Sequence, residues 1–133
     1  MATKTWNEKL NCDKEAQIKV LSHSFGEMRE GDKMLIPSPL LIKEYMESIP
    51  QGNQKSIAEM RKELAFQFKA DGTCHLTTGI FCRIVAEAAL EDLALGQNKI
   101  TPFWRVISSK DKISKKLSCG IDFINTYRQK EDL

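Results

Sequence analysis

The chain has 133 residues, 41% hydrophobic and 29% charged, the composition of one ordinary globular domain. No apolar run approaches the roughly 18 residues that a membrane helix needs, and the N-terminus is too polar for a signal peptide, so we expect a cytoplasmic protein with no membrane contact. Its net charge of +2 is uneven, because residues 1–98 carry 12 Lys/Arg and 14 Asp/Glu whereas residues 99–133 carry 8 and 4. This basic C-terminal stretch suits contact with nucleic-acid phosphates, although solubility alone also explains it.

The four cysteines, Cys12, Cys74, Cys82 and Cys119, form no CxxC pair, and we expect free thiols. A metal site made by Cys74, His75 and Cys82 would need an unusual ligand spacing, so neither a metal nor another cofactor is predicted. Cys74 and His75 are also a weak nucleophile and base pair, since adjacent side chains seldom face each other. Cys82 lies in an apolar stretch, and we expect it to be buried and inert.

We expect residues 1–35 to form an N-terminal extension that packs partly on the domain formed by residues 36–133. Some helix is expected around Glu15 to Leu21, but Gly26 and Gly31 break any longer pattern. Met34-Leu35-Ile36 ends at a proline and predicts a strand or an extended entry segment.

Two capped helices are predicted next. Ser38 and Pro39 supply an N-cap and a proline at the first helical position, followed by apolar residues at four-residue spacing: Leu41, Tyr45 and Ile49, with Ile42 and Met46 beside them. Ser56 and Glu59 form a capping box. The helix that it opens ends near Ala70 and presents one apolar face: Ile57, Met60, Leu64, Ala65 and Phe68.

A third helix is expected from a cap at Thr77 or Thr78 to about Leu95. Its buried stripe comprises Phe81, Val85, Ala89 and Leu93, widened by Ile80, Ile84 and Ala88, with Arg83, Glu87 and Glu91 together on the other side. Phe103 to Ile107 is aromatic and β-branched and predicts a strand. The basic residues 108–116 then predict a loop or the tip of a small hairpin, and an amphipathic helix closes the chain.

This order predicts a mainly α fold with a small β-hairpin, in the arrangement of a winged helix-turn-helix. The stretch from Ile49 to Glu131 resembles the DNA-binding domain of the O6-alkylguanine-DNA alkyltransferases and their non-catalytic relatives, the alkyltransferase-like proteins. The resemblance rests on short motifs in matching order: Ile49-Pro50-Gln51-Gly52, Ser56-Ile57, Arg83-Ile84-Val85-Ala86-Glu87, Pro102-Phe103-Trp104-Arg105-Val106, Cys119-Gly120 and Glu131.

Two departures from the family decide the expected activity. Phe103 stands where the family has its alkyl-accepting cysteine, and Trp104 stands where it has the histidine that draws off the proton. Neither side chain accepts an alkyl group or a proton, and alkyl transfer needs a thiolate. Glu131 would then be left without partners for the proton relay. The resemblance therefore implies a non-enzymatic protein.

The resemblance implies that the partner is double-stranded DNA, with O6-alkylguanine as the expected lesion, and that a monomer hands it to a repair-protein partner. Arg83 falls where the family's arginine enters the base stack. Helix-terminal and basic residues are expected to contact phosphates: Thr77, Thr78, Gly79, Ser56, Lys110, Lys112, Lys115 and Lys116. The lesion pocket is expected to be lined by Phe103, Trp104, Arg105 and Glu131. Ile57 in place of the family's tyrosine, and a longer linker after Arg83, depart from the base-flipping pattern.

Plainer interpretations remain beside these. Arg83 is four residues from Glu87, which predicts a surface ion pair, and Phe103 and Trp104 are also typical of core aromatics. The whole domain is alternatively a protein-interaction module with no DNA role. A third alternative is an enzyme that uses Cys74 or Cys119.

Overall fold

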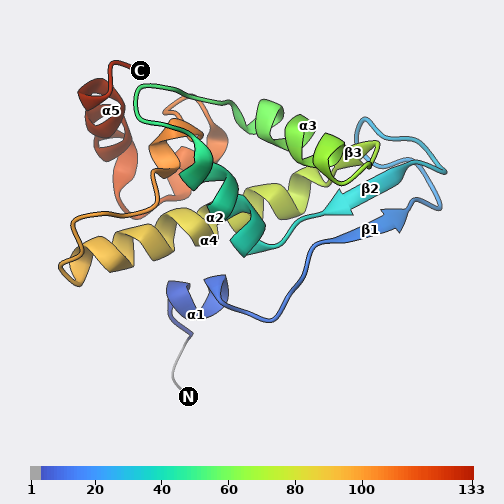
Figure 1. Cartoon of the computed structure of the whole chain (residues 1–133), viewed down its shortest axis with the longest axis horizontal. Helices are drawn as coiled ribbons and strands as arrows, with labels where there is room; N and C mark the ends of the chain where they lie inside the picture. The colour runs from blue at the N-terminus through green and yellow to red at the C-terminus, as the bar shows by residue number, and fades with distance from the viewer. Residues whose placement is uncertain (1–3) are drawn as a thin grey trace.

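The structure is a computed structural model that describes residues 4–133, and about half of the chain is helical, with one small three-stranded sheet (Figure 1). In chain order the elements are α1 (Trp6–Leu10), β1 (Gln17–Val20), β2 (Lys33–Ile36), α2 (Pro39–Ser48), α3 (Ile57–Gln67), β3 (Gly72–Thr73), α4 (His75–Ala94), the 3₁₀ helices η1 (Phe103–Arg105) and η2 (Lys112–Lys116), and α5 (Gly120–Lys130). The mainly α prediction with a small β component is confirmed.

Both predicted helix caps are confirmed. The Ser38 hydroxyl accepts a hydrogen bond from the backbone N–H of Leu41, and a proline follows at the first helical position of α2. At the start of α3, Ser56 and Glu59 form the expected reciprocal capping box. Each cap uses groups only three residues apart, so the chain needs no tertiary context to start these helices.

The sheet joins the predicted extension to the predicted domain. β1 pairs antiparallel with β2, and β2 pairs parallel with the two-residue β3. Residues 17–20 are therefore a strand where the sequence predicted helix, because pairing with β2 satisfies their backbone and suits the β-branched Ile18 and Val20. Since β2 spans residue 35, the packing does not divide at that residue.

The helix α4 is the centre of the molecule. It runs across the middle of Figure 1, with the sheet near its N-terminal end and α5 beyond its C-terminal half, while α1 lies along one side of it. Side chains on most of its circumference are buried, including Phe81, Cys82, Val85 and Ala89. Glu87 is only 3% exposed, because it accepts hydrogen bonds from the backbone N–H and hydroxyl of Ser118. The expectation that it lies on a solvated face with Arg83 was wrong.

The predicted strand at Phe103–Ile107 and the hairpin at 108–116 are also wrong. Residues 103–105 form η1, in which the N–H groups of Arg105 and Val106 donate to the carbonyls of Pro102 and Phe103, and no strand lies beside them for pairing. Residues 112–116 form η2, held by Asp111, which accepts from the N–H of Ser108, and by the buried Ser114, whose hydroxyl donates to backbone carbonyls. Local side-chain bonds to the backbone thus replace a β ladder.

Candidate nucleic-acid interface

A groove of about 830 Å³ lies where α1, α3, α4 and η2 meet, and we call it the basic groove. It is lined by Trp6, Lys9, Ile57, Ala58, Arg61, His75, Leu76, Gly79, Ile80, Arg83, Ile84, Asp111, Lys112, Ile113 and Lys116. Five of these side chains are cationic, and one is a carboxylate.

The cations of the basic groove come from four elements. Lys9 lies on α1, Arg61 on α3, Arg83 on α4, and Lys112 and Lys116 on η2. Within residues 4–133, Arg61 is the one member of this set that forms an ion pair, with Glu27 at 2.8 Å. The other four form no ion pair among the described residues, and the lining holds more cationic than anionic side chains, which favours an anionic partner.

The one carboxylate of the groove, Asp111, offsets part of this positive charge. It accepts a hydrogen bond from the N–H of Ser108 at 2.8 Å and so fixes the turn before η2. Local structure thus holds the acid in place while Lys112 and Lys116 extend from the same turn as exposed side chains.

Arg83 stands on the wall of the groove without the ion pair to Glu87 that its spacing predicts. Among the described residues, its buried Nε has no hydrogen-bond partner. Its guanidinium instead lies 5.3 Å from the centre of the Trp6 ring, a cation–π distance. The guanidinium therefore keeps donors available for an anion that enters the groove.

The floor of the groove is apolar. Leu76 and Ile80 on the first turns of α4 are 56% and 58% exposed, although the hydrophobic pattern placed Ile80 in the buried stripe. A Cβ built on Gly79, which lies between them, would meet nothing within 4 Å. This turn of α4 is thus open to close approach by a partner.

The structure brings together only part of the predicted DNA-binding set. Arg83, Gly79, Lys112 and Lys116 share the groove, whereas Ser56, Lys110 and Lys115 are exposed outside its lining. The sequence did not predict three further lining residues, the aromatic Trp6 and the cationic Lys9 and Arg61. No local signal marks them, because they reach the groove only through the packing of α1 and α3.

Neither predicted threonine cap stands at the helix terminus. The helix α4 begins at His75, two to three residues before them. Thr78 is fully buried and donates to the carbonyl of Cys74, and Thr77 lines a different hollow beside residues 13–17. Neither threonine lines the basic groove, and their predicted position as helix caps was wrong. The reason is that β3 keeps the chain extended up to Thr73, and α4 starts at once.

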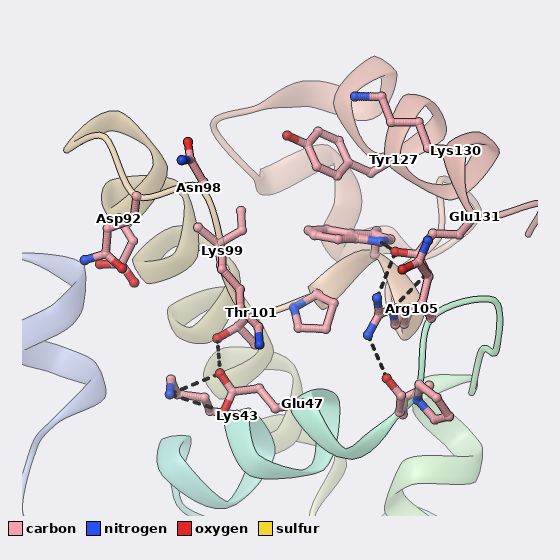
Figure 2. A pocket seen from close by; sticks show the side chains of 17 residues that line it. Lys43, Glu47, Asp92, Asn98, Lys99, Thr101, Arg105, Tyr127, Lys130 and Glu131 are labelled. Atoms are coloured by element: carbon pink, nitrogen blue, oxygen red, sulfur yellow. Dashed lines mark hydrogen bonds and ion pairs between the residues drawn. The ribbon is translucent and has the colours of Figure 1, made fainter.

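The predicted lesion-pocket residues lie elsewhere. A second hollow of about 910 Å³ is lined by Trp104, Arg105 and Glu131 together with residues from α2, α5 and the C-terminal end of α4 (Figure 2). It shares no lining residue with the basic groove, and the two occupy opposite ends of α4. Phe103 lines neither, because it is fully buried and stacks on Phe123. Its expected role as a pocket wall was wrong, and its interpretation as a core aromatic is confirmed.

Glu131, predicted to lack partners for a proton relay, has hydrogen-bond partners of another kind. It accepts hydrogen bonds from Trp104 Nε1 at 2.8 Å, from Arg105 Nε and Nη2 at 2.8 and 3.0 Å, and from the N–H of Gly52 at 3.3 Å. Burial alone would raise the pKa of Glu131, but these hydrogen bonds and the Arg105 charge outweigh it and hold the pKa below its ordinary value. Arg105 also donates to the carbonyl of Ile49, as Figure 2 shows. Together they clamp α5 to the turn before α3, a structural role.

Two of the four cysteines, Cys82 and Cys119, have thiols whose pKa is raised. Burial, with the Asp111 carboxylate nearby, raises the pKa of Cys82 to about 12, and burial also raises the pKa of Cys119. Cys74 is 5% exposed in a small apolar cluster, whereas His75 faces the groove and stacks on Phe25. No group of three or more metal-ligating side chains is found within residues 4–133, and no helix there is both long and apolar enough to cross a membrane.

Comparison of the chain with protein-family models, with curated proteins and with solved structures finds no match.

Proposed function

We propose that this protein is a non-catalytic DNA-binding protein that holds double-stranded DNA against the basic groove. One observation carries the proposal: Lys9, Arg83, Lys112 and Lys116 converge from three elements, and none of them has a carboxylate partner among the described residues. Cations gathered in one groove attract anionic partners, and DNA phosphates supply anions at regular spacing.

The arrangement of α3 and α4 supports the same proposal. Residues 68–74, which include β3, separate the two helices, and the exposed N-terminal turns of α4 lie in the groove, where the recognition helix of a helix-turn-helix would meet DNA. The 3₁₀ helix η2 is not a hairpin wing, but its lysines line the groove beside α4. In this proposal α4 meets the duplex, and Lys112 and Lys116 contact the flanking backbone.

Recognition of alkylated guanine is the narrower form of the proposal, and it has less support. Arg83 lines the basic groove, but Phe103 is buried and the Trp104 hollow lies at the other end of α4. We therefore place general duplex binding first, with lesion preference and transfer to a repair protein as expectations from the family resemblance.

The experiment is a salt titration of duplex affinity by fluorescence anisotropy, with plain and O6-methylguanine duplexes. Each phosphate contact contributes about 0.9 to the slope of log affinity against log salt. Lys112→Ala with Lys116→Ala should lower the slope by roughly 2 on both duplexes. Lys19→Ala with Lys33→Ala is the matched control, since these exposed lysines on β1 and β2 lie outside the groove but remove the same charge.

Failure of the wild-type protein to bind either duplex at low salt would refute the proposal, and equal slopes for the two double variants would refute the placement in the basic groove. Tighter binding to the O6-methylguanine duplex would support the narrower form.

The exposed Leu76 and Ile80 favour one second candidate, a protein-interaction surface at the same place. Apolar side chains at the centre and charges at the rim are typical of protein interfaces. Leu76→Ser with Ile80→Ser separates the two, because it should leave the salt slope of DNA binding almost unchanged but abolish an apolar protein contact.

A further inference from the structure

The short helix α1 is fastened to α4 by an unusually complete set of hydrogen bonds. Glu91 on α4 accepts from the backbone N–H groups of Trp6 and Asn7, each at 2.9 Å, and from the Asn7 side chain at 3.0 Å. The same Asn7 amide donates to Asp92 at 3.0 Å and to the carbonyl of Ala88 at 3.3 Å. A five-residue helix is too short to hold its own place in water, so these contacts fix where it lies.

The anchor also sets which side chains of α1 enter the basic groove. Trp6 follows directly from the anchored backbone, and its ring is approached by Lys9 Nζ at 4.1 Å and by the Arg83 guanidinium at 5.3 Å. Both cations and the ring line the groove. Residues near the start of the chain thus line a groove whose other members lie between residues 57 and 116.

The contact with Trp6 explains how Arg83 keeps a defined place without a polar partner. Its Nε is buried and has no hydrogen bond among the described residues, so no ion pair or carbonyl orients the guanidinium. An aromatic face attracts a guanidinium and leaves its N–H donors available to other partners. Trp6 therefore restricts Arg83 without neutralising it, which is what a phosphate-binding arginine requires.

We propose that α1 is an integral wall of the DNA interface, in which Glu91 anchors the helix, Trp6 positions Arg83 for the phosphates, and Lys9 adds a phosphate contact. This inference rests on the proposed function and deepens it, since it assigns a role in DNA binding to the N-terminal segment. Trp6 is a positioning residue that acts through Arg83.

The test is a double-mutant cycle between Trp6 and Arg83, with duplex affinity measured by anisotropy at low salt. Trp6→Ala should weaken binding roughly threefold to tenfold, the range expected from a cation–π contact. In the Arg83→Ala background, Trp6→Ala should cause almost no further loss, because the residue it positions is gone. Trp6→Phe should restore most of the affinity, since it keeps an aromatic face.

Three further variants complete the design. Glu91→Gln should release α1 and weaken binding as Trp6→Ala does, and it serves in place of Trp6→Ala if that variant fails to fold in circular dichroism. Lys9→Ala should lower the salt slope by about 0.9. Lys4→Ala, an exposed lysine outside the groove with the same charge change, should leave the slope unchanged.

The outcomes separate the two levels of the proposal. If the wild-type protein binds no duplex, the proposed function fails and this inference fails with it. If the wild-type protein binds but Trp6→Ala and Glu91→Gln bind equally well, only the role of α1 is overturned. A loss of equal size in the wild-type and Arg83→Ala backgrounds overturns it as well, because Trp6 would then act through general stability.

Discussion

Replacing Glu131 by glutamine tests whether this residue is structural or belongs to a reaction. The carboxylate accepts three side-chain hydrogen bonds, from Trp104 and twice from Arg105, and the Glu131 and Arg105 side chains are 8% and 15% exposed. Breaking a buried ion pair by removing one partner costs about 3–5 kcal/mol. Because neither side chain is completely buried, we expect the lower end, about 3 kcal/mol, which for a chain of this length lowers Tm by roughly 10 °C.

The assay is thermal unfolding by circular dichroism at pH 7, with duplex affinity measured in parallel. Glu47→Gln is the matched control, because Glu47 lines the same hollow and pairs with Lys43 but is 43% exposed. An exposed pair contributes about 0–1 kcal/mol, so this variant should melt close to the wild type. The Glu131 variant should still bind DNA at temperatures where it is folded. A Tm for Glu131→Gln within error of that for Glu47→Gln would refute the structural role.

The same pair predicts a pH dependence of definite sign. The pKa of Glu131 is lowered in the folded protein, so the unfolded state binds the proton more readily. Its stabilisation is therefore complete above the unfolded pKa of about 4.3 and is lost as the pH falls through the lower folded value. The difference in Tm between the wild type and Glu131→Gln should be constant from neutral pH to about pH 5 and should shrink below it. A difference that grows on acidification would contradict this assignment.

Three further predictions concern a helix cap, a buried hydroxyl and a buried thiol. Ser56→Ala removes the cap of α3 and should lower the free energy of unfolding by about 1 kcal/mol in a urea titration, with the exposed Ser22→Ala as control. Ser114→Ala removes the buried hydroxyl that holds η2. It should weaken duplex binding although Lys112 and Lys116 are unchanged, because η2 positions both lysines. Cys82 should resist iodoacetamide at pH 8 in the native protein, because burial raises its pKa to about 12, and it should react after unfolding, as intact mass will show. A native protein labelled at Cys82 would contradict its burial.

Incubation with a benzylguanine substrate checks the expectation that the protein is not an enzyme. Phe103 is buried and carries no nucleophile, and the pKa values of Cys82 and Cys119 are raised, so we expect no added mass. A benzyl adduct on any cysteine would overturn the non-enzymatic proposal.

The wrong predictions share a physical cause, because each concerns a residue whose environment is set by tertiary packing. Phe103 to Ile107 has the composition of a strand, but a strand needs a neighbour for its backbone, and here α4 and α5 surround it. Glu87 has a spacing typical of a surface ion pair, yet tertiary packing buries it against Ser118. One missed signal was available: the Ser108-x-x-Asp111 spacing predicts a local turn rather than a hairpin tip.

The sequence by itself determined where α2 and α3 begin, since Ser38 and Ser56 each satisfy an N–H group three residues away. It also determined the mainly helical class through the apolar periodicity of α2 and α5. Only the tertiary structure decided the basic groove, because Lys9, Arg83 and Lys116 meet there from distant parts of the chain. Capping depends on residues within one helical turn, so a local pattern predicts it. A binding surface depends on the packing of distant segments, which no local pattern predicts.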